Sequence, residues 1–322
     1  MTATDDPGDL NGPLEDGARG PRTGRAPGSL WLRPQSLLLT FCGDHLLDRE
    51  GAVFSGGLID VLDRVGVKEH AARSTLARMT RRGLLTRHRH GKRVYHGLTE
   101  RAREVLREGE ERVWRRPAVN RDWDGRWTLL GFSLPEHQRG DRHLLRSRLS
   151  WAGFGPLQNG LWLTPAAVDV DRLLEGLDVV GHVKAFRATM ISPTEIGQVI
   201  ADAWDLDALA ARYRAFLDRW DRPDPAPGAR DDLARRLLLL TEWLMLVRED
   251  PRLPVEHLPA DWPAVRAEAV ALRLRDAYEA PARRIAEEIL QWAPEPAAGP
   301  AASSGAPCPA GDGGARPTGA AP

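Results

Sequence analysis

The stretch from Arg64 to Arg93 reads RVGVKEHAARSTLARMTRRGLLTRHRHGKR, and the interpretation of the whole chain depends on it. It holds ten lysines and arginines against one acid, Glu69, so its net charge is +9. The whole protein of 322 residues is neutral, with 45 basic and 45 acidic residues. A local excess of positive charge that the rest of the chain cancels indicates a polyanionic partner.

The first half of this stretch predicts an amphipathic helix over residues 69–82. Ala72, Leu76 and Met79 are spaced at i, i+4 and i+7, which makes one apolar stripe. At about 100° per residue, the opposite face carries small, polar and basic residues, namely His70, Arg73, Ser74, Ala77, Arg78 and Arg81. Gly83 then ends the helix, as glycine does just beyond a helix terminus.

The second half predicts a β-hairpin with strands over 84–88 and 93–96 and a turn at 90–93. A helix with a basic face followed by a basic hairpin is typical of a winged helix-turn-helix. In that fold the helix lies in the major groove, where arginine reads guanine, and the hairpin tip contacts phosphate or the minor groove. The alternative is a solvated amphipathic helix on an ordinary basic surface.

The residues upstream complete the same pattern. Pro34 predicts the start of a first helix, where its missing N–H costs nothing. Ser55 is expected to cap a second helix over 56–64, and Gly66-Val67 forms the tight turn before the basic helix. Helix, helix, turn, helix and hairpin therefore follow one another between residues 34 and 96.

Composition and periodicity divide the chain into five parts and predict an α+β protein. Thr99 is expected to cap a long charged helix, 100–115, that links the first domain to the next. The predicted parts are a disordered tail (1–29), a winged helix-turn-helix domain with its linker helix (30–116), a ferredoxin-like α/β module (117–192), a helical domain (193–293) and a second disordered tail (294–322).

The middle part reads as β-α-β(β)-α-β, the order of a ferredoxin-like fold. A helix over 139–151 is expected to turn Leu144, Leu145 and Leu149 inward. The other expected elements are a buried strand (127–133), one or two strands around an Asn-Gly turn (155–163), a second helix (170–177) and a last strand (182–188).

The last part is helical, with a linker at 221–228 and a break expected near Pro281. Its aromatic residues could line an effector pocket, although their helical spacing favours a core: Tyr213, Phe216, Trp220, Trp243 and Trp262.

Three blocks of sequence resemble the PaaX family of bacterial transcriptional repressors of aromatic acid catabolism. The similarity spans about residues 30–292. The matching blocks are RPQSLLLTFCGD (33–44) with RRGLL (81–85) and LTER (98–101), then WDGRW (123–127) with GLWLTP (160–165), and finally REDPRLP (248–254) with LPADWP (258–263).

The resemblance implies a homodimeric repressor that binds an inverted-repeat operator in double-stranded DNA and releases it when an aryl-acyl-CoA, typically phenylacetyl-CoA, binds. No other cofactor is expected. Arg142, Arg146 and Arg148 on the middle helix could meet the CoA phosphates, or simply form a solvated face. The residues expected to contact DNA are His70, Arg73, Ser74, Arg78, Arg81, Arg82, Lys92 and Arg93.

Two other functions are weighed against this one. The middle module of the family resembles a small nuclease of CRISPR adaptation, whose first strand ends near a metal-binding Asp. The matching stretch, 131–134, has no carboxylate, and Asp124 with Glu136 at its flanks is a weak metal signal. We therefore expect no enzymatic activity. The second alternative is a DNA-binding protein that responds to no effector.

Several classes are excluded by composition. No segment approaches the roughly 20 apolar residues of a membrane span, and the N-terminus is not a signal peptide, so we expect a cytoplasmic protein. Cys42 and Cys308 make neither a disulfide framework nor a zinc site. His88, His90 and His96 could be neighbours in the hairpin, with His70 nearby, but the surrounding cations oppose a metal.

Overall fold

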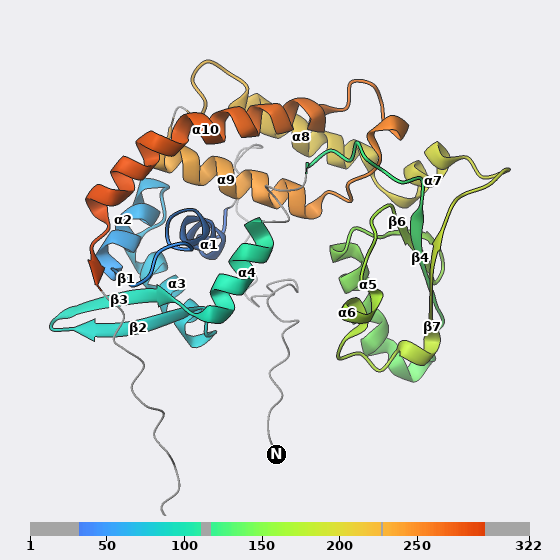
Figure 1. Cartoon of the computed structure of the whole chain (residues 1–322), viewed down its shortest axis with the longest axis horizontal. Helices are drawn as coiled ribbons and strands as arrows, with labels where there is room; N and C mark the ends of the chain where they lie inside the picture. Colours follow the sequence, from blue (N-terminus) through green and yellow to red (C-terminus); the bar gives the residue numbers. More distant parts are fainter. Residues whose placement is uncertain (1–31, 111–116, 227, 294–322) are drawn as a thin grey trace, which may run out of the picture.

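The computed structural model describes residues 32–110, 117–226 and 228–293 (Figure 1). The expected disordered tails and the end of the linker helix lie outside these residues. In the N-terminal unit the elements are α1 (Pro34–His45), β1 (Ala52–Phe54), α2 (Ser55–Arg64), α3 (Glu69–Arg81), β2 (Leu85–His90), β3 (Arg93–Leu98) and α4 (Glu100–Glu110).

Local chemistry explains most of these boundaries. Pro34 occupies the first turn of α1, as expected. The Thr99 hydroxyl accepts a hydrogen bond from the N–H of Ala102 at 3.1 Å and caps α4. The expected cap at Ser55 is wrong, because Ser55 is already helical and Phe54, which precedes it, ends the short strand β1, which was not predicted.

That missed strand organises the first sheet, whose order is β2-β3-β1-β8. β1 pairs with β3 on one side, with Val53 opposite His96. On its other side it pairs with β8 (Trp292–Ala293), with Val53 opposite Trp292. The end of the described chain therefore forms the edge of a sheet that begins 240 residues earlier, counted from Ala52 to Trp292.

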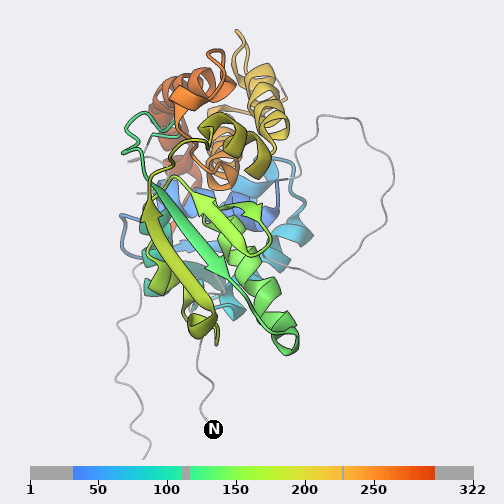
Figure 2. The ribbon, with the colours of Figure 1, turned by 90° about the vertical axis from the view of Figure 1, so that its right-hand side faces the viewer.

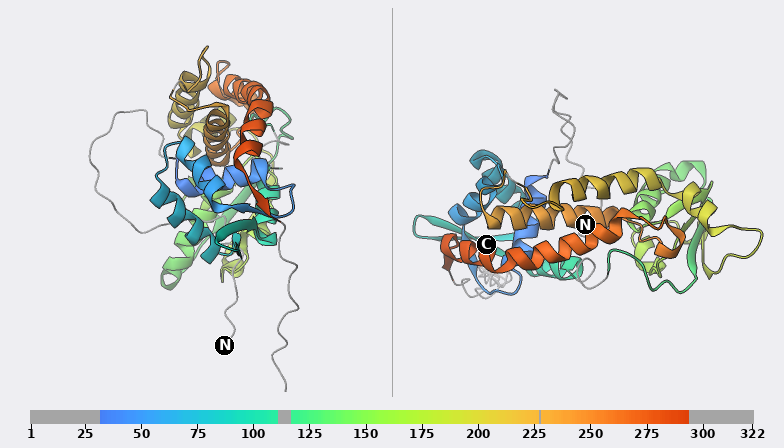
Figure 3. Two further views of the ribbon diagram at one scale, coloured as in Figure 1. Left: turned by 90° about the vertical axis from the view of Figure 1, so that its left-hand side faces the viewer. Right: turned by 90° about the horizontal axis from the view of Figure 1, so that it is seen from above.

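Between residues 193 and 293 the described part of the chain forms five helical segments. These are α7 (Ile196–Ala203), α8 (Leu206–Trp220), α9 (Asp232–Glu249), the short 3-10 helix η5 (Val255–His257) and α10 (Pro263–Ile289). Seen from above, α8, α9 and α10 lie side by side between the N-terminal unit at one end and the central unit at the other (Figure 3).

The N-terminal unit and the last helices share one hydrophobic core. Leu38, Leu58 and Met79 of the N-terminal unit are fully buried in the same cluster as Leu237 of α9 and Ala286 of α10. At 1.5 Å per residue α10 extends for about 40 Å, and it crosses α9 to reach β8 (Figure 1). The basic helix α3 and its hairpin are thus built on the C-terminal helices.

The expected helix break at Pro281 is wrong. α10 runs without interruption from Pro263 to Ile289, with Pro281 inside it. Proline in a helix removes one backbone hydrogen bond and costs about 3 kcal/mol. Ala282 and Ala286, which follow it, are buried against the rest of the core, and this packing holds the helix together.

The central unit has a four-stranded antiparallel sheet of order β5-β6-β4-β7 (Figure 2). Leu130 of β4 packs against α5 residues Leu145 and Leu149, whereas Trp127 of β4 packs on the opposite face against Ile200 of α7. Its elements are β4 (Trp127–Phe132), the 3-10 helix η3 (Glu136–Gln138), α5 (Arg139–Trp151), β5 (Gly155–Gln158), β6 (Leu161–Thr164), α6 (Val170–Leu174), the 3-10 helix η4 (Val180–His182) and β7 (Val183–Ala188).

Helix α5 has the expected bounds, but fewer of its leucines face the core than expected. Leu145 and Leu149 are fully buried, but Leu144 is 43% exposed, so its expected inward position is wrong. Leu145 and Leu149 are four residues apart and share one face, whereas Leu144 lies about 100° away from Leu145 around the helix.

Candidate nucleic-acid interface

Helix α3 presents one polar face to solvent and one apolar face to the core. Ala72, Thr75, Leu76 and Met79 are buried, as the spacing of the apolar residues predicted for three of them. The residues of the other face are exposed, apart from the half-buried Arg78: His70, Arg73, Ser74, Ala77 and Arg81, followed by Arg82. The helix therefore offers a surface of small and basic side chains with nothing from the described chain covering it.

Arg73 is held in a pair that DNA could displace. Its Nε and Nη2 atoms donate to Glu69 Oε1 at 2.9 and 2.6 Å. Both side chains are more than 60% exposed, so the pair contributes little to stability. The free-energy cost of Arg73 leaving Glu69 for a guanine edge or a phosphate is therefore small. Arg78 is more restrained, since it donates to the Thr75 hydroxyl at 3.4 Å.

The hairpin projects from the same unit as a two-stranded ribbon (Figure 1). β2 and β3 pair from Leu85–Leu98 to His90–Arg93. Gly91 occupies the first turn position with φ +60°, a conformation that glycine adopts without strain. Lys92 at the tip is exposed, and so are the arginines of the adjoining strands. The tip is therefore basic, as the sequence predicted.

Arg93 lies at this tip and already has partners. Its Nη1 donates to Gln291 Oε1 at 2.6 Å, and its guanidinium lies 5.2 Å from the centre of the Phe54 ring. Gln291 directly precedes β8, and Phe54 ends β1, the strand that pairs with β8. Arg93 thus connects the hairpin to the end of α10. Among the described residues, Lys92 has no hydrogen-bond or ion-pair partner of this kind.

One of the ten cations counted in the basic stretch faces inward. Arg64 donates to Asp60 Oδ2 at 3.1 Å and is paired with Asp231, the N-cap residue of α9. Its side chain is only 13% exposed. Arg64 therefore joins α2 to α9 instead of contributing to the basic surface, and sequence spacing gave no signal of a partner 167 residues away.

The turn between α2 and α3 fixes the direction of α3. Gly66 has φ +83°, and the N–H of Val67 donates to the carbonyl of Leu62 at 3.0 Å. A side chain at position 66 would be strained in this conformation. The turn is therefore closed by backbone contacts, and its position follows that of α2.

The hairpin histidines do not form the cluster that was considered. His88 lies opposite Tyr95, whereas His96 lies opposite Arg87, so the register places His96 on the other face of the ribbon from His88 and His90. His96 is buried, and this burial lowers its pKa below the ordinary value of 6.5. Among the described residues no three His, Cys, Asp or Glu side chains are placed to hold a metal ion.

The two carboxylates that flank β4 are not arranged as a metal site. Asp124 accepts two hydrogen bonds from Arg187 Nη2, each at 2.9 Å, and the Arg187 bond holds the pKa of Asp124 below its ordinary value. Glu136 lies in the short 3-10 helix beyond β4. The arginine that pairs with Asp124 occupies the place a cation would take.

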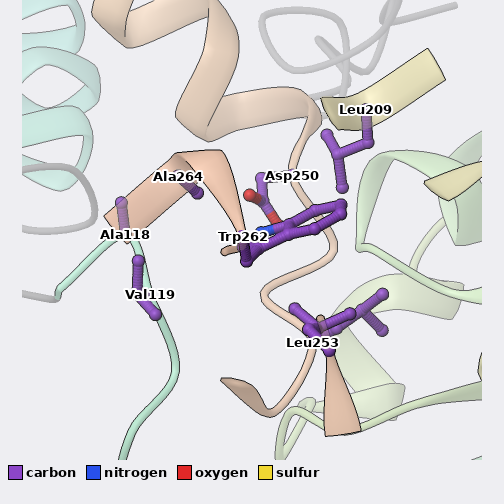
Figure 4. A pocket seen from close by; sticks show the side chains of 8 residues that line it. Ala118, Val119, Leu209, Asp250, Leu253, Trp262 and Ala264 are labelled. Atoms are coloured by element: carbon purple, nitrogen blue, oxygen red, sulfur yellow. The ribbon is translucent and has the colours of Figure 1, made fainter. Parts of the chain in front are cut away.

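The aromatic residues considered for an effector pocket are core. They are all buried in one cluster beneath α8, α9 and α10, namely Tyr213, Phe216, Trp220, Trp243 and Trp262. The cavity beside Trp262, shown in Figure 4, has a volume of only about 10 Å³. That is room for about one water molecule and not for a thioester.

A buried hydrogen bond lies next to this small cavity. The hydroxyl of Tyr213 donates to Asp250, and the N–H of Arg252 donates to the same carboxylate at 2.6 Å. Burial raises the pKa of Tyr213 well above 10 and also raises that of Asp250. Asp250 therefore ties the chain that follows α9 to α8.

The arginines of α5 hold the backbone of the central unit. Arg142 donates to the carbonyl of Leu134, and Arg148 Nη1 donates to the carbonyls of Leu173 and Glu175, at 3.0 and 2.5 Å respectively. Arg146 is exposed. Two of the three arginines considered for CoA phosphates thus have structural partners.

A helix and a hairpin with exposed basic side chains are mounted on a helical scaffold and joined to a unit with an antiparallel sheet, and this basic face is suited to a polyanion. Three family models match the chain in order. They are the PaaX-like protein (residues 33–102), the PaaX protein central Cas2-like domain (120–200) and the PaaX-like protein C-terminal domain (204–288). The chain belongs to the PaaX family of transcriptional regulators.

Known proteins similar to this chain include a bacterial repressor and a protein of solved structure. The transcriptional repressor PaaX of Escherichia coli (strain K12) is 29% identical over 252 residues, which covers 74% of this chain and 78% of that protein. The structure of the uncharacterized protein Rv0674 from Mycobacterium tuberculosis is 26% identical with a TM-score of 0.53, and covers 78% of this chain and 96% of that one. In the described part of the chain, no helix is both long and apolar enough to cross a bilayer.

Proposed function

We propose that this regulator represses transcription by binding an operator in double-stranded DNA through a winged helix-turn-helix, with α3 in the major groove and the β2–β3 tip on the backbone. The observation that carries the proposal is the exposed face of α3, where small residues alternate with arginines. Small side chains let the helix approach the bases, and arginine reads guanine through two hydrogen bonds. Lys92 at the tip is suited to a phosphate.

The eight proposed contact residues fall into two roles. Arg73 and Arg78 on the outer face of α3 are assigned to bases, Ser74 is placed close to the backbone, and His70 lies on the same face. The remaining four lie where the helix ends or at the hairpin tip and are assigned to phosphates: Arg81, Arg82, Lys92 and Arg93.

We further propose that the protein is a homodimer that reads an inverted repeat. The central unit, whose strand order β5-β6-β4-β7 fits a ferredoxin-like fold, is the proposed dimerisation module. β7 is an edge strand, and apolar side chains on and beside it are exposed: Val180 by 67%, Phe186 by 60% and Ile191 by 77%. Exposed apolar groups along an unpaired strand edge are suited to pairing with a second copy.

The proposed effector is an aryl-acyl-CoA, of which phenylacetyl-CoA is the first to test. The E. coli relative is named as a repressor, and a repressor must be released by a signal if its genes are to be expressed. Release requires that the effector bind the DNA-incompetent arrangement more tightly than the DNA-bound one.

Fluorescence anisotropy on the promoter DNA beside the protein's own gene tests the proposal. The protein should bind this DNA tightly and bind an unrelated duplex weakly, and phenylacetyl-CoA should release it whereas free phenylacetate should not. Equal affinity for both duplexes would contradict the operator proposal. Specific binding that the thioester leaves unchanged would contradict the effector proposal alone.

A further inference from the structure

A cavity lies where the N-terminal unit meets the C-terminal helices. It has a volume of about 560 Å³, which is within the range of small-molecule sites. Its wall combines the end of α2 and the following turn with the end of α8, the loop before α9, and α9 itself. The lining residues are Asp63, Arg64, Val65, Gly66, Arg219, Ala226, Gly228, Ala229, Arg230 and Leu238.

The chemistry of this lining suits an anion that carries an apolar part. Three arginines and one acid line the cavity. Asp60, Asp231 and Glu242 pair with these arginines, so an anion has to draw a guanidinium away from its acid. Leu238 packs against the two large hydrophobic clusters on either side and gives the cavity an apolar floor. Guanidinium groups around an apolar floor match a phosphate-bearing acyl ligand.

The arginines are held at the cavity with different firmness. Arg64 is fixed by Asp60 and Asp231. Arg219 lies 3.6 Å from Glu242, a buried carboxylate to which Trp220 Nε1 also donates at 2.8 Å. Arg230 is 56% exposed and only approaches its acids, at 3.6 Å from Asp63 and 4.0 Å from Asp60.

The loop wall of the cavity is already shaped. Ala226 has φ +48°, a left-handed conformation that costs a residue with a side chain about 1 kcal/mol or more. The N–H of Ala229 donates to the carbonyl of Ala226 at 2.9 Å, and Arg235 Nε donates to the carbonyl of Pro225 at 3.4 Å. Backbone strain retained beside a cavity and stabilised by hydrogen bonds is characteristic of a binding site.

The cavity also adjoins the turn that directs α3. Asp63 and Gly66 belong at once to the cavity wall and to the turn closed by backbone bonds. A ligand that draws Arg230 away from Asp60 and Asp63 removes two of the contacts that hold the end of α2 against the loop before α9. α3 follows directly after this turn, so the ligand acts on the orientation of the DNA-facing helix.

We propose that this cavity is the effector site. A CoA thioester binds there with its phosphates on Arg219 and Arg230 and its apolar part on Leu238. Its binding displaces the turn at 63–66 and so weakens DNA binding. The identity of the thioester rests on the proposed function. The location rests on the cavity, its arginines and its contact with the turn.

Isothermal titration calorimetry on the full chain tests the site with phenylacetyl-CoA, free CoA, ADP and phenylacetate as separate probes. Phenylacetyl-CoA should bind the unmodified protein, and phenylacetate should not. Arg230→Ala should weaken thioester binding on the order of tenfold, the loss expected for a charge-assisted contact. Ala229→Trp should fill the cavity and abolish binding. Arg222→Ala, an exposed arginine on the same loop that does not line the cavity, is the matched control and should bind normally.

The outcomes separate the site from the effector class. If the unmodified protein does not bind phenylacetyl-CoA, both the effector and its site are overturned. If it binds and both Arg230→Ala and Ala229→Trp bind equally well, only the site is overturned. Should Ala229→Trp fail to fold, the exposed Arg230→Ala substitution decides. A merely structural role is distinguished by DNA release, because a folded Ala229→Trp protein should bind operator and stay bound when the thioester is added.

Discussion

The buried pair of Asp44 and Arg236 offers a sharp test of the shared core. Arg236 of α9 donates two hydrogen bonds to Asp44 at the end of α1, from Nε at 2.6 Å and from Nη2 at 2.7 Å. Its Nη1 also donates to the carbonyl of Arg275 in α10 at 2.5 Å. The two side chains are 8% and 17% exposed. One guanidinium therefore joins the N-terminal unit to both long helices.

Replacing Arg236 with methionine should destabilise the protein by about 3 kcal/mol. Breaking a buried pair by removing one partner costs about 3–5 kcal/mol, since the other charge is left without compensation. The 17% exposure of Asp44 and its contact with His45 Nε2 at 3.2 Å favour the lower end of that range. The double substitution Asp44→Leu with Arg236→Met should recover most of the loss, because no charge is then left buried.

Urea unfolding followed by circular dichroism measures this loss, and Arg49→Met is the matched control. Arg49 also joins the N-terminal unit to α10, through Glu287 at 3.1 Å, but these side chains are 46% and 52% exposed. Its replacement should cost about 1 kcal/mol or less. Equal losses for Arg236→Met and Arg49→Met would refute the reasoning that α1 and α9 form one core.

Three further predictions follow from single residues. Burial lowers the pKa of His96 below 6.5, so the unfolded chain binds a proton at this histidine more readily than the folded chain. The contribution of neutral His96 to the free energy of unfolding is therefore present above pH 6.5 and is lost as the pH falls below it. His96→Gln should therefore flatten the decline of the urea midpoint in acid, and an unchanged slope would count against this. Burial also raises the pKa of Cys42 to about 12, so iodoacetamide should leave Cys42 unmodified in the folded protein and modify it in urea, as peptide mass mapping would show; rapid labelling of the folded state would contradict its burial. Gly160→Ala should cost more than Gly176→Ala in the same urea assay, because both positions have positive φ but only at 160 does the added methyl meet the carbonyl of Phe132; equal costs would show that this contact relaxes freely.

Local patterns in the sequence were enough to place α3 and the hairpin. The spacing of Ala72, Leu76 and Met79 identifies the buried face of α3 without reference to the rest of the chain. The Asn-Gly turn between β5 and β6 is likewise a local signal and is confirmed. Such elements could be predicted because neighbouring residues alone determine them.

Contacts between distant parts of the chain could not be predicted in the same way. β8 consists of Trp292 and Ala293, too short to show any alternation, and only its pairing with β1 makes it a strand. The helix through Pro281 depends on packing against α9, and the inward turn of Arg64 depends on Asp231. The eight proposed DNA contacts were chosen by charge and helical face, and they stay predictions.

The salt dependence of operator binding tests the proposed interface most directly. Affinity should be measured by anisotropy over a series of salt concentrations for the unmodified protein, Lys92→Ala, Arg73→Ala and the control Arg146→Ala, an exposed arginine of the central unit. Lys92→Ala should weaken every sequence and reduce the slope of log affinity against log salt by about 1, whereas Arg73→Ala should cost about 1–3 kcal/mol and relax base preference. Arg146→Ala should leave both unchanged. If Arg73→Ala and Lys92→Ala bound operator as tightly and as selectively as the unmodified protein, with the same salt slope, then α3 and the hairpin would not be the surface that reads DNA.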